Sequence, residues 1–325
     1  MPAQPLDLAQ LRDRLAPLDV SDVAPLSGGA SSLTFTARAR EKRVVVKVAP
    51  PGLPAVLNRD VLRQARLLRA LHGSAVPVPE VLWEDAGDPP DVPPLFVMSF
   101  VDGDSLEPLF DRGGDVPEAL VAERMRNAAT TLGALHAIDP AAIGLGGEPT
   151  VDVDAEIERW CRALDTVDPL LAPGWQEVAA DLRAAEPRTA TGNSVVHGDF
   201  RLGNLLAAGP GIAAVVDWEI WTVGDPRVDV GWFLVNADPQ TYRRGTRYAD
   251  ALPSRADLFD DYMRAFGRGA PDVPWFEALA CFKSTATWSL IVKHNRRRED
   301  PDADVESVAG ALPHLLDRAR DLVRT

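Results

Sequence analysis

The chain has 325 residues, of which 46% are hydrophobic and 25% are charged, and its formal net charge is −14 at pH 7. This length and composition are typical of a globular protein with a buried core and exclude a disordered chain. The acidic balance argues against nucleic acid as a partner, because a phosphate backbone is bound by a basic surface.

The sequence also limits where the protein is expected to work. The two cysteines, Cys161 and Cys281, lie far apart in helix-like segments, so neither a disulfide framework nor a zinc site is expected. The start of the chain lacks the pattern of a signal peptide, and no apolar run approaches the roughly 20 residues that a membrane helix needs. We therefore expect a soluble, cytoplasmic protein with no membrane partner.

The first part of the chain reads as a small antiparallel sheet with one main helix. An amphipathic helix is predicted at about 6–15, and a second, longer one at 54–72, where apolar residues recur at three-to-four spacing. Between and after them lie β-branched runs that are typical of strands. These predicted strands are 34–38, 43–48, 81–84 and 95–101.

The rest of the chain reads as mostly helical, with one β-rich island at 195–216. The predicted helices are 116–136, 154–164, 174–185, 256–266, 275–294 and 305–323. A sheet lobe followed by a helical lobe with an inserted hairpin predicts an α+β fold with a cleft between two lobes. The break at Asp102-Gly-Asp places the lobes at 1–101 and 102–325.

The β-rich island carries the residues that point to a chemistry. It contains His197-Gly-Asp199, then Asn204 five residues after the aspartate, and Asp217 thirteen residues later at the end of an apolar strand. A carboxylate at Asp199 can accept the proton of an attacking hydroxyl. Asn204 and Asp217 offer the oxygen ligands that Mg²⁺ prefers when it bridges nucleotide phosphates. This spacing favours phosphoryl transfer.

These motifs also carry a family resemblance. The run HGDFRLGNLL, followed by VVDWE and GDPRVDV, resembles the aminoglycoside phosphotransferase and choline kinase branch of the protein-kinase-like superfamily, over about 26–233. The resemblance implies a bilobal kinase-like fold, ATP and Mg²⁺ as cofactors, Asp199 as base, and Asn204 and Asp217 as metal ligands. It also implies that His197 and Gly198 shape the catalytic loop, which two acids, Asp225 and Asp229, brace.

The resemblance assigns the nucleotide clamp to the sheet lobe. Lys47 lies on a strand whose side chains alternate, and a lysine on an inner face is costly unless it meets an anion such as the ATP phosphates. The turn at Gly28 and Gly29 is expected to fold over those phosphates with its backbone N–H groups. The strand ending in Met98, Ser99 and Val101 is expected to be the hinge: Met98 walls the pocket, and the backbone from Ser99 to Val101 meets the adenine edge. Alone, Lys47 is more typical of an edge or solvent-facing lysine, and the glycines are more typical of a plain hairpin turn. The expected hinge looks identical to an ordinary buried strand.

One residue departs from the kinase pattern. The helix after the lysine strand of a kinase supplies a glutamate partner, but here Gln64 stands in that place. Gln64 is expected to hydrogen-bond Lys47 without neutralising it, and Asp60, one turn earlier, is the alternative acid. The departure also motivates a second hypothesis about function, in which the protein is a nucleotide-binding pseudokinase that serves as a regulatory module.

Other charged groups are predicted to have structural roles. His136 is expected to cap the carbonyls at a helix end. The acids at 152–158 are expected to interact favourably with the dipole at the start of a helix, and the alternative is that they surround a site for a cationic substrate. The basic run at 293–298 is expected to lie at the end of a helix.

The expected acceptor is a small hydroxylated molecule. Only six residues separate Asp217 from Gly224, and no Ala-Pro-Glu triplet follows, which leaves little room for the peptide platform of a protein kinase. An aminoglycoside, an amino alcohol or another metabolite fits this expectation. The sequence does not choose among these acceptors or between ATP and GTP, and it leaves the oligomeric state open.

Overall fold

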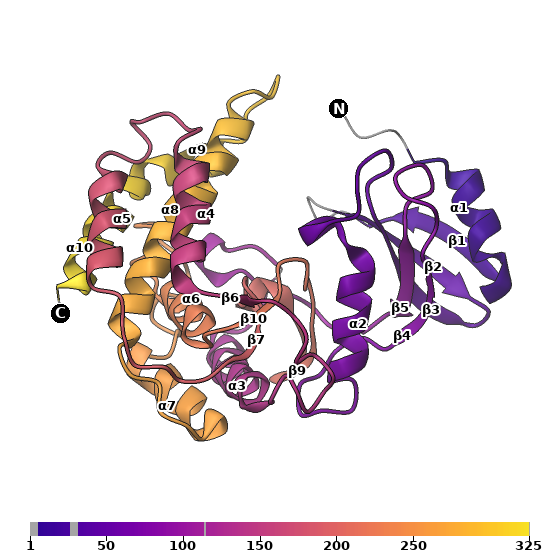
Figure 1. The fold of residues 1–325 in the computed structure, drawn as a ribbon, viewed down its shortest axis with the longest axis horizontal. Helices are drawn as coiled ribbons and strands as arrows, with labels where there is room; N and C mark the ends of the chain where they lie inside the picture. Colours follow the sequence, from indigo (N-terminus) through magenta and orange to yellow (C-terminus); the bar gives the residue numbers. More distant parts are fainter. Residues whose placement is uncertain (1–5, 27–31, 114, 325) are drawn as a thin grey trace.

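The first part of the chain forms an antiparallel five-stranded sheet in the order β1-β2-β3-β5-β4 (Figure 1). This computed structural model describes residues 6–26, 32–113 and 115–324. The predicted glycine turn at Gly28 and Gly29 lies outside the described residues. The strands are β1 (Val20–Pro25), β2 (Leu33–Ala39), β3 (Lys42–Val48), β4 (Val81–Asp85) and β5 (Leu95–Ser99).

Two helices cover the two faces of this sheet. Helix α1 (Leu8–Leu15) buries Leu11 and Leu15 on the face that carries Val44, Val46 and Val48. Helix α2 (Val61–Leu71) packs its apolar stripe on the opposite face, against Phe96 and its neighbours. The alternation in β3 therefore sends Lys47 toward α2 and away from α1.

Helix α2 begins later than predicted. The segment before it forms a 3₁₀ turn, Leu57–Arg59, and the carboxylate of Asp60 then accepts a hydrogen bond from the Arg63 N–H at 3.0 Å. An aspartate in this position satisfies one of the free N–H groups of the first helical turn, so it fixes where the helix starts. The predicted start at Pro54 was wrong for this reason.

The rest of the chain is mostly helical. Its helices are α3 (Glu118–Ala137), α4 (Val153–Leu164), α5 (Trp175–Ala184), α6 (Arg227–Ala237), α7 (Arg255–Phe266), α8 (Val273–Asn295), α9 (Ala303–Val308) and α10 (Leu312–Val323). Helix α8 runs through this part beside α4, α6 and α10 (Figure 1). Three short 3₁₀ turns complete it: Pro108–Phe110, Leu202–Asn204 and Ala309–Ala311. The predicted α+β fold is confirmed.

Two small sheets lie among these helices. Strands β8 (Leu205–Ala208) and β9 (Gly211–Val215) form the predicted hairpin. Strand β7 (Ser194–Val196) pairs instead with β10 (Thr222–Gly224), which also pairs with β6 (Thr150–Val151). This second sheet was not predicted from the sequence.

Two predictions about the helices were wrong. Helix α6 was missed, and the helix predicted at 305–323 is divided by the 3₁₀ turn Ala309–Ala311. Within the described ranges, no helix has both the length and the apolar character that crossing a membrane requires.

Candidate active site

A buried aspartate on α6 shapes the loop after β7. Asp229 accepts hydrogen bonds from the backbone N–H groups of His197 at 2.6 Å and Gly198 at 2.9 Å. Burial alone would raise the pKa of Asp229, but hydrogen bonds from His136 and the loop outweigh it and hold this pKa below its ordinary value. An ionised Asp229 therefore holds the backbone of the loop in place at His197 and Gly198.

Gly198 is required by the shape of this loop. Its φ of +86° is in the region that favours glycine, and an added Cβ would lie 2.8 Å from the Ile220 carbonyl oxygen. The loop can therefore pass close to the segment that follows Asp217 only with glycine at this position.

His136 contributes to the same support, but not as predicted. Its Nε2 lies 3.4 Å from the Asp229 carboxylate and its Nδ1 lies 3.1 Å from the Tyr262 hydroxyl. The ring is fully buried. The prediction that His136 caps carbonyls at the helix end was wrong, because a buried imidazole takes its partners from the core around it.

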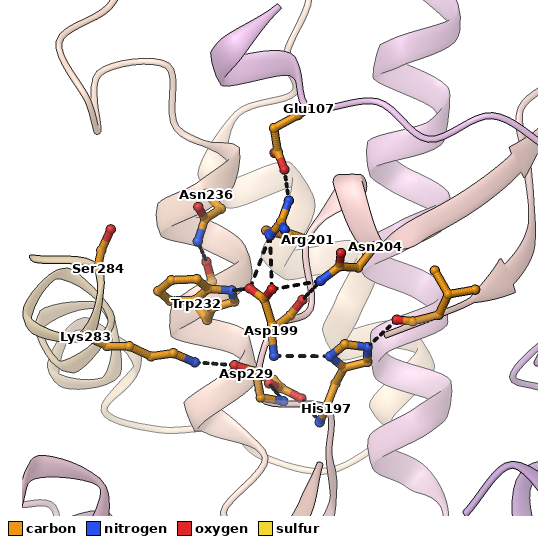
Figure 2. A network of polar contacts seen from close by, with 12 residues as sticks. Glu107, His197, Asp199, Arg201, Asn204, Asp229, Trp232, Asn236, Lys283 and Ser284 are labelled. Atoms are coloured by element: carbon orange, nitrogen blue, oxygen red, sulfur yellow. Dashed lines mark hydrogen bonds and ion pairs between the residues drawn. The ribbon is translucent and has the colours of Figure 1, made fainter. Parts of the chain in front are cut away.

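Asp199 is held at the centre of a polar network (Figure 2). Its carboxylate accepts hydrogen bonds from the Trp232 indole N–H at 2.8 Å and the Asn204 amide at 2.8 Å, and both of its oxygens lie 3.2 Å from Arg201 Nε. The side chain keeps 26% exposure. Burial raises the pKa of Asp199 to about 7, and the nearby Lys283 charge opposes part of this rise. Such a pKa suits a general base at neutral pH.

Asn204 lies beside Asp199, and Asp217 follows a residue that is hydrogen-bonded to the Asn204 backbone. The Val216 N–H donates to the Asn204 carbonyl at 3.0 Å, which ties the loop to the end of the hairpin. The Asn204 amide nitrogen is used by Asp199, which leaves its side-chain oxygen as the donor atom. Asp217, with φ of 66°, turns its carboxylate toward Lys47. Oxygen donors of this kind suit a hard cation such as Mg²⁺.

Lys47 connects the sheet to this carboxylate. It is 7% exposed, and its Nζ lies 3.2 Å from Gln64 Oε1 and 3.5 Å from Asp217 Oδ1. Asp60, the alternative partner, caps α2 instead. The Gln64 amide nitrogen is buried without a partner among the described residues. Gln64 therefore holds Lys47 by a neutral hydrogen bond, and the acid that faces the lysine charge is Asp217.

An open pocket of roughly 400 Å³ lies between the sheet and the loop. Six of the predicted site residues line it: Lys47, Met98, Ser99, Val101, Asn204 and Asp217. Fewer backbone groups of the predicted hinge are available to an adenine base than expected. The N–H groups of Ser99 and Phe100 already donate hydrogen bonds to the carbonyls of Glu80 and Arg43. The backbone of Val101 remains for a contact with a base.

Three residues of the network were missed by the sequence reasoning. Arg201 Nη1 contacts Glu107, in the segment that follows the sheet, while Trp232 and Lys283 reach the loop from α6 and α8 (Figure 2). Lys283 is buried, contacts the Gly198 carbonyl, and lies 4.1 Å from the Trp232 ring centre. A single lysine inside the apolar run of α8 was the available signal.

The acids near α4 are already engaged. Asp152 caps the helix, Asp154 and Glu158 pair with Arg183 at 2.9 Å, and Glu156 accepts from the Trp160 indole at 3.0 Å. This favours the structural reading of these acids over a rim for a cationic substrate. The basic run after α8 also has internal partners, such as Glu306 for Arg296.

Comparison with known proteins identifies the family. The model of the phosphotransferase enzyme family matches residues 22–272. Acyl-CoA dehydrogenase family member 10 of Mus musculus is 24% identical over 313 residues, which cover 90% of this chain but 28% of that protein. The chain spans about a third of the length of the curated relatives that it matches first.

Solved structures share the fold along nearly the whole chain. A protein of Ralstonia eutropha assigned as an aminoglycoside phosphotransferase superposes with a TM-score of 0.78 at 23% identity, covering 98% of this chain and 99% of that one. An aminoglycoside phosphotransferase in a ternary complex with ADP and hygromycin B gives 0.64 at 17% identity, with 96% and 97% covered. By its motifs, its fold and the family match, the chain belongs to the phosphotransferase enzyme family.

Proposed function

We propose that this protein transfers the γ-phosphoryl group of ATP to a hydroxyl group of a small molecule. One observation carries the proposal: Lys47, Asn204 and Asp217, from two parts of the chain, line one open pocket, and the Asn204 side chain donates a hydrogen bond to the Asp199 carboxylate. In this arrangement residues 1–101 form the nucleotide-binding lobe, and residues 102–325 carry the catalytic loop and the acceptor site.

Asp199 is the base in this proposal. It accepts the proton of the acceptor hydroxyl, so that the O–H bond breaks while the new O–P bond forms and ADP leaves. The hydrogen bonds from Trp232 and Asn204 fix the direction of its carboxylate. Arg201 lies beside it and can stabilise negative charge on the transferred group.

Lys47 and the pocket receive ATP. The lysine charge, held by the neutral Gln64, meets the phosphates, while Met98 and Val101 line the pocket for the base. The side-chain oxygens of Asn204 and Asp217 would hold Mg²⁺, which when bound neutralises charge on the phosphates. The solved complex of a structural relative with ADP and hygromycin B supports a nucleotide and a small-molecule acceptor as the two ligands of this protein.

The test is the variant Asp199→Asn, which keeps the size of the side chain and removes the base. We expect ADP formation, with water or with hydroxylated acceptors, to fall by about 10²- to 10⁴-fold. Binding of ATP with Mg²⁺, measured by titration calorimetry, should persist. The exposed Asp321 provides a matched control as Asp321→Asn, with unchanged turnover.

Two results would change the assignment. Turnover by Asp199→Asn at the wild-type rate would remove Asp199 from the role of base. Nucleotide binding by the wild type without ADP formation from water or any acceptor would favour a regulatory pseudokinase.

A further inference from the structure

Two adjoining hollows share no described lining residue with the open pocket beside Lys47. The larger, of roughly 500 Å³, lies between the start of α2, helix α4 and the segment 219–222. The smaller includes Gly198, next to Asp199, and Lys283. They share the walls Val151, Glu156, Arg159, Ile220 and Thr222, so we treat them as one space, the α4 channel.

The walls of the α4 channel are largely apolar. Val151, Ile220 and Trp221 line it, and Leu57, which is 81% exposed, stands at its outer end. An exposed leucine beside a hollow is a contact that an apolar ligand can cover. The channel therefore suits a molecule with an apolar body.

The acids at the channel already have partners. Asp225 accepts hydrogen bonds from Arg227 at 2.7 and 3.0 Å, and Glu156 accepts from Trp160 at 3.0 Å. A ligand with several ammonium groups binds through ion pairs with carboxylates that have no other partner. The carboxylates of Asp225 and Glu156 are already used, so they do not favour such a ligand here. The channel is lined by three acids, Glu156, Glu219 and Asp225, and by four basic residues, Arg63, Arg159, Arg162 and Lys283. The excess of acids in the chain, whose net charge is −14, therefore lies outside the channel.

Of the cations at the channel, Arg63 is held by Glu148 and the Trp221 carbonyl, whereas the other three lack a close ion pair among the described residues. Lys283 is 5% exposed, and in the described ranges of the chain no carboxylate lies within ion-pair distance of it. Arg159 is 3.6 Å from Glu156, and Arg162, which is 69% exposed, is 3.9 Å from Glu158. A guanidinium group has five N–H donors, so both arginines keep capacity for a ligand.

We propose that the acceptor occupies the α4 channel and combines an apolar body with an oxyanion group, such as a carboxylate, that Arg159 and Arg162 bind. The inference rests on the proposed function. The hydroxyl of this molecule loses its proton to Asp199 and gains the phosphoryl group of ATP, and ADP leaves. The Lys283 amine lies at the inner end of the channel, in contact with the Gly198 carbonyl.

The experiment uses acceptors that differ only in charge. Two sets are compared: para-(hydroxymethyl)benzoate with its amide and its benzylamine analogue, and ω-hydroxydodecanoate with its amide and its amine analogue. Kanamycin serves as a polycationic reference. ADP formation by the full chain with ATP and Mg²⁺ gives kcat/KM for each acceptor. We expect the carboxylate of at least one set to exceed its amide by about tenfold, the worth of a charge-assisted hydrogen bond.

Variants connect this preference to the channel. Arg159→Gln with Arg162→Gln should lower kcat/KM for the carboxylate by about tenfold and leave the amide little changed. The exposed Arg297 and Arg298, mutated to Gln together, are the matched control and should change neither.

The outcomes separate the two proposals. Transfer to amides, amines or kanamycin with no advantage for either carboxylate overturns the anionic acceptor and leaves the phosphotransferase assignment standing. A carboxylate advantage that survives in the Arg159 and Arg162 variant overturns the role of the channel arginines. ADP formation from neither water nor any acceptor overturns both proposals.

Discussion

A single buried histidine joins the catalytic loop to the strand that leads to Asp217. His197 Nδ1 accepts the Asp199 N–H at 3.1 Å, so Nε2 carries the proton and donates to the Val216 carbonyl at 3.0 Å. The ring is fully buried and lies 4.4 Å from the Trp218 ring centre. One neutral imidazole therefore positions both acids of the site.

The neutral state of His197 predicts how stability depends on pH. Burial lowers the pKa of His197 from its ordinary 6.5. Below pH 6.5 the unfolded chain binds a proton at this position that the folded chain does not, so the contribution of His197 to the free energy of unfolding should decrease as the pH falls from 7.5 to 5.5. The raised pKa of Asp199 contributes with the opposite sign over the same range, so the His197 contribution is the difference between the wild type and a variant that lacks this imidazole. Urea unfolding at a series of pH values measures this slope.

The variant His197→Asn isolates that contribution. Asparagine can still accept the Asp199 N–H but does not titrate in this range. We expect this variant to have a lower free energy of unfolding than the wild type at pH 7.5. Acidification should lower that free energy less than it does in the wild type. An equal slope in the two proteins would assign the pH dependence to other groups.

At the residue scale, the sequence could predict the site where spacing is local. Asp199 and Asn204 are five residues apart on one loop, and they meet in the structure as expected. Lys283 and Trp232 could not be found in this way, because helices far along the chain bring them to the loop. The Lys47 to Gln64 contact was expected because strand and helix periodicity put both on facing surfaces.

At the element scale, α6 and α8 approach closely at one glycine. A Cβ on Gly231 of α6 would lie 2.3 Å from the Phe276 carbonyl oxygen of α8. Helix α6 also carries Asp229 and Trp232, while α8 carries Lys283. The distance between these two helices therefore sets how their side chains meet the catalytic loop.

This contact predicts the effect of Gly231→Ala. The added methyl group must push α6 away from α8, which we expect to lower the free energy of unfolding by about 1–3 kcal/mol, as overpacking does. ADP formation should fall because Asp229 and Trp232 move with α6. The control is Gly310→Ala, where an added Cβ meets nothing within 4 Å. Equal stability of the two alanine variants would contradict the packing argument.

The same burial explains which elements the sequence could predict. Helix α4 has a strong amphipathic pattern and was expected at 154–164, one residue from its observed start. Helix α6 is buried all round, so the sequence has no apolar stripe there to reveal a helix. Strand β6 has two residues and depends on pairing with the distant β10. Such an element has no local signal.

At the scale of the whole molecule, a shared apolar core and several polar contacts connect the sheet and α2 to the helical part. Lys47 meets Asp217, and the Val215 N–H donates to the Pro77 carbonyl at 2.8 Å. Arg63 of α2 donates to the Trp221 carbonyl at 2.8 Å and to Glu148 at 3.1 Å, and its guanidinium group lies 3.9 Å from the Trp221 ring centre. The sequence predicted two lobes but gave no sign of this arginine, because its partners lie about 85 and 158 positions away.

Arg63 and Arg66 allow this connection to be tested with a matched pair. Both contact Glu148 from α2, but Arg63 is 20% exposed and Arg66 is 58% exposed. Arg63→Ala removes buried hydrogen bonds and the ring contact, and we expect a loss of about 2 kcal/mol in the free energy of unfolding. Arg66→Ala removes a surface ion pair, which is worth about 0–1 kcal/mol.

Turnover should separate these variants further. Without Arg63, α2 loses its hydrogen bonds to the Trp221 carbonyl and to Glu148, so Gln64 of α2 and Lys47 of the sheet are held less firmly at their distance from the Asp217 carboxylate. We expect kcat for ADP formation to fall several-fold in Arg63→Ala and to stay near the wild-type value in Arg66→Ala. If both variants lost activity equally, the charge of Glu148 would explain the effect. If neither did, the approach of Lys47 to Asp217 would not depend on α2, and the sheet would hold the lysine in place alone.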